Sequence, residues 1–593
     1  MRRRCATFAL LAAGLLLAVG CSSTHYRRSA DRQVYRIIQQ VEQSVFGRTN
    51  KFSIDTPYAG RSPATIPPEE IIGGRMATNR RILTLEMALD LAVRHSREYQ
   101  SQREQLYLTA LNLTGSRYQF TPQFFANSKG TMSSDTSEEK RVTLDPVTGA
   151  PMATNFVTVR SWSGSLRNSV GVDQVLKTGG SLGVAIVNDL FRYYTGDPRR
   201  SAVSTISVNL AQPLLRGFGR NNPAVESLTQ AERNVVYAVR SYSLYQNQFA
   251  VNIVSAYFSL LGQKDLVRNN YTNFLRRVET GRYLGARAVD RVRQSQVDDA
   301  RSAELGARIS YINSLASYLT ALDAFKTRLG LPLSEQWYLD DVDLRELEAT
   351  GLMPADIESQ ASFRVAVATH MDILNAIDRF EDSKRKVRLA ADALKPRLDL
   401  FADASLRSEG DTDYTNFDPD KIRTGFGLQL DLPFSRRAER NDYRATLISF
   451  ESQLRSLVST LDGFKDKVDR GLRTLEYQRL NYLNRQLALE VARRRVEMNQ
   501  MLLEAGRVEI QQVREAQDAL IAAQNDVTTS LVSYLQARLQ LLLDVGVLRT
   551  DTPKFWLTDI LDSLRPAIRA GKSPLYMPED QLLPPDHYLE PQP

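Results

Sequence analysis

Two copies of one short stretch decide the fold of this 593-residue chain. The first reads Gly285-Ala-Arg-Ala-Val289-Asp-Arg-Val292-Arg293-Gln-Ser-Gln296, and the second reads Gly506-Arg-Val-Glu-Ile510-Gln-Gln-Val513-Arg514-Glu-Ala-Gln517. In both copies a β-branched residue stands four places after the glycine, with Val, Arg and Gln seven, eight and eleven places after it. Each glycine interrupts a long helix-forming run, and glycine accepts the left-handed conformation that ends a helix. The two stretches predict the tips of two helical hairpins that descend from one unit.

Two prolines support this duplication. Pro213 precedes Gly285 by 72 residues, and Pro433 precedes Gly506 by 73 residues. Each proline ends a strand-like run just before a long helical pattern. The duplication predicts the following organisation: repeat 1 at 84–335, an inter-repeat linker at 336–355, repeat 2 at 356–548 and a surface tail at 549–593.

Within each repeat the same order of elements is expected. A first helix is predicted at 84–118 and again at 356–394, and a strand region follows each of them. Long helices are predicted at 223–280 and 438–505, and return helices at 289–329 and 510–543. A helix of about 57 residues would be about 85 Å long, which is too long for a globular core.

The strand regions differ in length between the repeats. The interval from Pro122 to Pro213 holds 91 residues, and the one from Pro396 to Pro433 holds 37. Repeat 1 therefore carries 54 extra residues, enough for an added hairpin and a long loop. The strand-and-turn composition of the longer interval predicts a hairpin at 165–188 that turns at Lys177-Thr-Gly-Gly180. The sequence leaves open whether this hairpin joins the other strands.

The amino terminus has the pattern of a bacterial export signal. Three arginines precede an apolar stretch at residues 8–19. Leu17-Ala-Val-Gly-Cys21 resembles a lipoprotein box, which predicts a signal peptide at 1–20, a lipid on Cys21 and an anchored linker at 21–83. The chain has two cysteines, and Cys5 would leave with the signal, so no internal disulfide is expected. The alternative is an ordinary secretion signal with an incidental cysteine.

No residue pattern predicts an enzyme, a metal site or a cofactor other than the lipid. His95 and His370 stand at nearly matching places in the repeats, which indicates packing, and no zinc-ligand spacing appears. The acidic segment 411–420 lacks the Gly and Glu of a calcium loop and is expected to be a solvated loop. Gly217-Phe-Gly219 lacks the Lys-Ser/Thr of a phosphate loop. A net charge of +8 with 68 acidic residues is no nucleic-acid footprint.

The duplicated order of helix, strands, long helix, glycine turn and return helix resembles the TolC outer-membrane efflux protein family over residues 84–548. The resemblance rests on Gln212-Pro-Leu-Leu-Arg-Gly-Phe-Gly219, on Leu432-Pro-Phe434 and on the paired glycine motifs. It implies a mainly α fold with β strands, in which duplicated long helical hairpins form a trimeric α-barrel. Each subunit would also give four strands to a shared outer-membrane β-barrel, and the 54 extra residues depart from that pattern.

The resemblance also implies function and partners. The expected protein is a homotrimeric, lipid-anchored exit duct of the outer membrane that extends into the periplasm. It would receive small molecules from a periplasmic adaptor protein and an inner-membrane transporter of the RND, ABC or MFS type. A duct for type I protein secretion is an alternative, and a coiled-coil adaptor or scaffold lipoprotein without a barrel is another. The residues expected at tips or partner contacts are Gly285, Arg287, Asp290, Gly506, Arg507 and Glu509, and those at strand-to-helix turns are Pro213, Gly217 and Pro433.

Overall fold

The computed structural model describes residues 23–76, 78, 80–144, 148, 151–194, 200–287, 293–352, 358–410, 412–552 and 554–557. The chain divides into two compact units. The first unit draws on residues 1–38, 108–236 and 379–454, and the second on residues 39–107, 237–378 and 455–593. Both repeats therefore contribute to both units.

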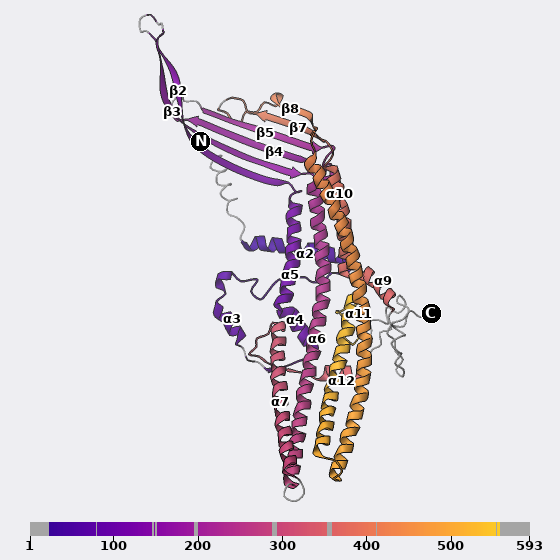
Figure 1. Cartoon of the computed structure of the whole chain (residues 1–593). Helices are drawn as coiled ribbons and strands as arrows, with labels where there is room; N and C mark the ends of the chain where they lie inside the picture. Colours follow the sequence, from indigo (N-terminus) through magenta and orange to yellow (C-terminus); the bar gives the residue numbers. More distant parts are fainter. Residues whose placement is uncertain are drawn as a thin grey trace, which may run out of the picture. The chain divides into compact units, whose positions relative to one another are not determined.

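The first unit contains one antiparallel sheet of six strands (Figure 1). The strands lie side by side in the order β2, β3, β4, β5, β7, β8, so β2 and β8 are the edges. The hairpin predicted around Lys177 is confirmed, because β3 and β4 pair on either side of this turn. The strands are β2 (Gln123–Leu144), β3 (Pro151–Val175), β4 (Ser181–Tyr193), β5 (Arg200–Pro213), β7 (Arg397–Arg407) and β8 (Arg423–Asp431). The sheet has six strands where the resemblance implies four, since the extra residues of repeat 1 add two strands to the sheet.

The pairing of β2 with β3 is much longer than any other in the sheet. β3 pairs with β4 only over Ser163–Val175, whereas it pairs with β2 over nearly its whole length. The outer part of β2 and β3 therefore forms a two-stranded ribbon beyond the rest of the sheet (Figure 1).

Helices at corresponding places in the two predicted repeats have matching lengths. The pairs are α4 (Leu85–His95) and α9 (Ser359–Thr369) with 11 residues each, α5 (Arg97–Tyr118) and α10 (Met371–Asp392) with 22 each, α6 (Pro223–Arg287) with 65 and α11 (Arg437–Glu504) with 68, and α7 (Gln294–Leu329) and α12 (Ile510–Val545) with 36 each. Among the helices in the described ranges, none is long and apolar enough to cross a membrane.

The first helix of each repeat, predicted as continuous, is broken in two. Ser96 and His370 have extended backbone angles, with ψ of 126° and 122°. Each side chain then accepts a hydrogen bond from the next helix, Ser96 Oγ from the Tyr99 amide at 3.5 Å and His370 Nδ1 from the Asp372 amide at 3.2 Å. The break is stable because the cap replaces backbone bonds that the helix loses.

These breaks lie against the glycines that end the return helices. Gly330 and Gly546 have φ of +78° and +77°. A Cβ on Gly330 would lie 2.1 Å from the carbonyl oxygen of His95, and one on Gly546 would lie 2.9 Å from the Cα of His370. In each repeat the backbone of this glycine thus lies so close to the end of the first short helix that a side chain on the glycine would clash. The packing role expected for the two histidines fits the buried His370, whereas the side chain of His95 is exposed and its backbone makes the closest approach to Gly330.

One of the two predicted glycine turns is wrong in detail. Gly506 has φ of +71° and follows the end of α11, as predicted. Gly285 instead lies inside α6, which continues to Arg287. The hairpin connection of repeat 1 falls among residues 288–292, outside the described part of the chain.

The expected linkers contain regular structure. The segment 21–83 forms α2 (Ser23–Phe46), α3 (Pro68–Arg75) and β1 (Arg80–Leu83), and 336–355 forms β6 (Gln336–Leu339) and α8 (Val342–Thr350). β1 and β6 pair in parallel, which joins the segment just before repeat 1 to the linker between the repeats. In α2 the buried residues Val34, Ile37 and Ile38 have helical spacing, which the sequence analysis missed. Short 3-10 turns lie at Pro63–Thr65, Gly219–Asn221 and Pro419–Lys421.

The tail is not wholly on the surface. Phe555 and Trp556 are 2% and 1% exposed, so the start of the tail packs into the second unit. The Pro-rich end lies outside the described residues, as do the predicted signal peptide and Cys21.

Candidate functional site

One face of the six-stranded sheet is apolar although the described chain leaves it uncovered. On β8, Phe426, Leu428 and Leu430 are 87%, 63% and 56% exposed. Because directly paired residues share a face, the register carries this face across every strand. Its members include Phe124, Val170, Val172, Leu182, Val184, Ile186, Ile206, Val208, Leu210, Leu398 and Leu400. A contiguous apolar surface of this kind marks contact with a membrane or with another protein.

The opposite face of the sheet is polar. Arg167 on β3 and Asp189 on β4 form an ion pair across the strands at 3.5 Å. Two glycines on this face are covered by aromatic rings, Gly171 by Phe125 and Gly427 by Phe401. Further polar members are Asn127, Lys129, Asp173, Asn209, Asp399, Asp403 and Gln429. A sheet with one apolar and one polar face can separate lipid from water.

The predicted turn residue Gly217 lies where β5 passes into α6, and Asp392 at the end of α10 organises this junction. Gly217 has φ of +78° and donates its amide to Asp392 Oδ2 at 2.7 Å. Asn221 Nδ2 and Lys395 Nζ donate to Asp392 Oδ1 at 3.1 and 2.5 Å. Burial opposes the charge of Asp392, but these three donors outweigh it and hold the pKa of the carboxyl below its usual value. The glycine-rich turn therefore binds the chain's own carboxylate, which leaves the Gly217 amide unavailable to a phosphate.

The two predicted prolines end the strands beside this junction. Pro213 is the last residue of β5 and pairs with Asp399 of β7. The next residue, Leu214, donates its amide to the Leu398 carbonyl at 2.8 Å. Pro433 lies two residues after the end of β8, in the turn before α11. A proline is suited to both places because it gives no amide to the sheet.

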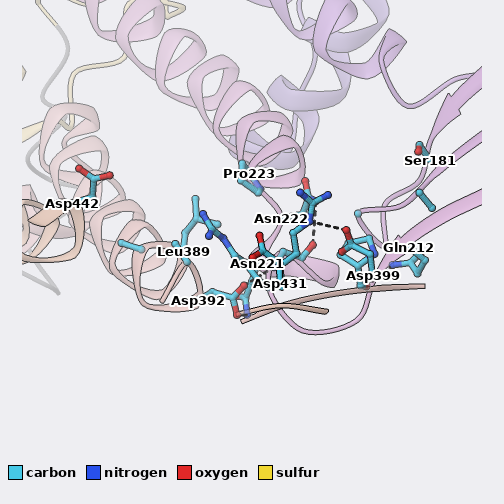
Figure 2. A pocket seen from close by; sticks show the side chains of 18 of the residues that line it. Ser181, Gln212, Asn221, Asn222, Pro223, Leu389, Asp392, Asp399, Asp431 and Asp442 are labelled. Carbon is cyan, nitrogen blue, oxygen red and sulfur yellow. Dashed lines mark hydrogen bonds and ion pairs between the residues drawn. The ribbon is translucent and has the colours of Figure 1, made fainter. Parts of the chain in front are cut away.

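A pocket of about 730 Å³ opens at the same junction (Figure 2). Figure 2 shows Asn221 and Asp392 close together, with Asp442 on α11 apart from them. The charged lining residues are Arg216, Lys386, Asp392, Arg397, Asp399, Asp431 and Asp442. Asp399 is paired with Arg397 at 2.7 Å, so part of this charge is neutralised within the pocket. Three basic and four acidic side chains thus line the pocket.

The helical tips form a second predicted site, in the second unit. Leu284 of α6, Ala300 of α7, and Ile510 and Val513 of α12 make one buried cluster. The repeated motif thus encodes packing between the hairpins, because Ile510 and Val513 are two of its shared positions. Gln517, a third shared position, is 4% exposed.

The other predicted tip residues lie outside this buried cluster. The amide of Gly506 donates to the Leu503 carbonyl at 3.0 Å and that of Arg507 to the Leu502 carbonyl at 2.9 Å, which closes the end of α11. Arg507 and Glu509 are exposed and available to a partner. Asp290 and the side chain of Arg287 lie outside the described residues.

An ion pair between a buried arginine and an exposed aspartate near the tips was missed by the sequence analysis. Arg277 of α6 has a side chain 6% exposed and contacts Asp518 of α12 at 2.6 Å. Burial lowers the pKa of the Arg277 guanidinium, and the Asp518 carboxylate acts against this shift. The partners are 241 residues apart, so no local pattern could have paired them.

Within the described ranges, no group of three or more His, Cys, Asp or Glu side chains could hold a metal ion. The acidic loop before β8 is bonded within itself, since Asp413 accepts from the Thr415 amide at 3.0 Å and Asp418 from the Asp420 amide at 3.1 Å. The absence of a metal or cofactor remains a prediction.

Neither a protein-family profile nor a curated protein matches the sequence. Solved structures do match. The channel-forming protein CusC superposes with a TM-score of 0.56 at 11% identity, covering 78% of this chain and 92% of that chain. The Campylobacter jejuni CmeC outer-membrane channel gives 0.55 at 14%, covering 82% and 89%. The Vibrio cholerae outer-membrane protein VceC gives 0.54 at 12%, covering 78% and 96%.

At these identities the likeness establishes the fold. The chain has the fold of the TolC-like outer-membrane channels, which confirms the resemblance seen in the sequence.

Proposed function

We propose that this protein is a channel of the outer membrane that exports small molecules in an efflux system. The observation that carries the proposal is the uncovered apolar face of the sheet, opposed by a polar face. Lipid would cover the first face and water the second. The solved outer-membrane channels with the same fold support this reading.

We propose further that three copies assemble into the channel. The strands β2 and β8 have one unpaired edge each, and an open edge is not stable in lipid. Cyclic symmetry would pair the edge of each copy with the next. On α7, Leu305, Ile309, Ile312 and Leu319 are 45–58% exposed, and neighbouring copies would cover them.

The proposed channel performs no chemistry of its own. Selectivity would come from the width and charge of the duct. Arg507 and Glu509 at the exposed tip would meet a periplasmic adaptor, which would link the duct to an inner-membrane transporter. An acyl chain on Cys21 would add a second membrane attachment.

A direct test compares a deletion strain with the strain that carries the intact gene. Loss of the protein should raise the accumulation of a fluorescent efflux substrate and sensitivity to toxic small molecules. Unchanged accumulation together with loss of an exported protein from the medium would instead support the type I secretion duct. Recovery of the protein as a detergent-free periplasmic monomer would support the adaptor or scaffold alternative.

A further inference from the structure

The hairpin formed by β3 and β4 has no counterpart in repeat 2. β2 follows α5 and β5 precedes α6, just as β7 follows α10 and β8 precedes α11. The strands between these landmarks in repeat 1, β3 and β4, are therefore the insertion. They account for most of the difference between the two strand regions.

The turn of the inserted hairpin is docked on the strand-to-helix junction. The Gly219 amide donates to the Thr178 carbonyl at 2.9 Å, and Thr178 Oγ1 donates to Gln212 Oε1 at 2.6 Å. A Cβ on Gly179 would lie 2.5 Å from the carbonyl oxygen of Gly217. Two glycines in this turn permit the close approach. The insertion is thus seated on the same junction that joins β5 to α6.

Side chains also join the inserted strands to their neighbours. On the apolar face, Ser128 of β2 donates to Asn168 Oδ1 of β3 at 2.7 Å. Ser204 of β5 donates to Asn188 of β4, and the Ser204 amide donates to Ser408 Oγ at 3.0 Å. These polar groups form a row across the sheet, and the hydrogen bonds within it lower the cost of placing polar groups on an apolar face.

The inserted strands have the pattern and length of the host strands. Val170 and Val172 on β3 pair with Ile186 and Val184 on β4, so the apolar face continues without a gap. β4 has 13 residues, more than the 9–11 or so that a tilted strand needs to cross a bilayer.

We infer that β3 and β4 are part of the membrane wall, so that three copies close a ring of eighteen strands in which β2 of one copy meets β8 of the next. This inference rests on the proposed trimeric channel. Barrel diameter grows roughly in proportion to strand number, so the ring would be about 1.5 times as wide as one built from four strands per copy. The added inner surface, with Ser169, Arg167 and Asp189, is polar, and the exit would be correspondingly wider and hydrated.

Disulfide cross-linking of the intact lipoprotein in native membranes tests which strands meet. Apart from the anchoring Cys21 the mature chain has no cysteine, so the background is clean. Each double variant carries Leu428→Cys on β8. In the test set the second cysteine is on β2, as Phe124→Cys, Ala126→Cys or Ser128→Cys. In the matched control set it is on β4, as Leu182→Cys, Val184→Cys or Ile186→Cys. All these positions lie on the apolar face, so paired Cβ atoms can come within disulfide range.

The eighteen-strand ring requires oxidised trimers with at least one β2 partner and none with any β4 partner. Cross-links to β4 alone would overturn the inference, because β4 would then be the edge strand, and β2 and β3 would lie outside a twelve-strand ring.

Electron cryo-microscopy of the intact protein and of a variant lacking residues 135–188 gives a second measurement. The variant removes 54 residues and leaves β2 and β5 joined by the segment 189–199, as in repeat 2. Its barrel should have about two-thirds of the intact diameter. Equal diameters, or twelve strands in the intact protein, would overturn the inference and leave the channel standing. Absence of any threefold ring from the intact protein would defeat the proposed function itself.

Discussion

Gly506 and Gly285 occupy the same place in the sequence motif but different backbone conformations. Gly506 has φ of +71°, whereas Gly285 is helical, and a Cβ added to Gly285 would meet no neighbouring side chain within 4 Å. A side chain at Gly506 would be strained, and one at Gly285 would be free of contact. Only one of the two glycines is therefore required by the local geometry.

We expect Gly506→Ala to weaken its hairpin tip by about 1–2 kcal/mol, the cost of the left-handed conformation for an L-residue. Gly285→Ala should strengthen the end of α6 by up to about 1 kcal/mol, since alanine is the better helix former. Hydrogen exchange of tip peptides measures both local opening energies. Equal effects of the two substitutions would show that the turns are alike.

His370 is a second residue whose surroundings matter, because its burial lowers the pKa of its imidazole. It is 4% exposed, caps α10 and packs on Phe464 at a ring distance of 4.4 Å. Burial lowers the pKa of His370 to about 4, with Asp372 raising it and Lys467 lowering it further. Since the unfolded value is about 6.5, the unfolded chain takes up a proton first as the pH falls.

Stability from neutral His370 should thus be complete above about pH 6.5 and be lost as the pH falls toward 4, by about 3 kcal/mol in all. His370→Asn keeps a side-chain acceptor for the Asp372 amide but does not titrate. Thermal unfolding across pH 4–7.5 should therefore be less pH-dependent in the variant. Parallel pH profiles would show that His370 does not control acid stability.

At the scale of the element, strand β8 places alternate residues on the apolar and the polar face of the sheet. Leu428 faces the apolar side and Gln429 the polar side, although they are neighbours in the chain. The two positions differ in surroundings but share strand, exposure and depth in the sheet.

An arginine at Leu428 should cost about 2–4 kcal/mol if this face meets lipid, whereas Gln429→Arg should be tolerated. The yield of heat-resistant oligomer in outer-membrane fractions reports the difference. Equal assembly of both variants would contradict contact between the apolar face and the membrane.

At the scale of the whole molecule, the apolar stripe of α7 has no cover in the described chain. Ile312 is 51% exposed, and its neighbour Asn313 is also exposed. Ala307, Ser314 and Leu322 face inward on the same helix. The helix thus packs on one side within the chain, and its other side is exposed.

Ile312→Glu should break the assembly into smaller species, because it places a charge where neighbouring copies are proposed to pack. Asn313→Glu adds the same charge one position away and should leave the assembly intact. Light scattering of the detergent-solubilised variants gives the mass. A trimer that survives Ile312→Glu would place the interface elsewhere.

Much of the fold could be predicted because it depends on local patterns. The helix lengths follow from apolar periodicity, and the turns at Pro213, Pro433 and Gly506 follow from backbone chemistry. The predictions that failed locally, at Ser96, His370 and Gly285, concern residues whose conformation the sequence leaves open. Ser96 can lie inside a helix or cap one, and Gly285 can turn or continue a helix.

By itself, the sequence determined the duplication, the two long hairpins and the alternation of the strands, since each is repeated over short spacings. Only the tertiary structure decided that the inserted hairpin joins the sheet, that Asp392 binds the turn at Gly217 and that Arg277 meets Asp518. Such pairings join residues far apart in the chain. Their strength comes from register, burial and charge, which exist only after the chain has folded.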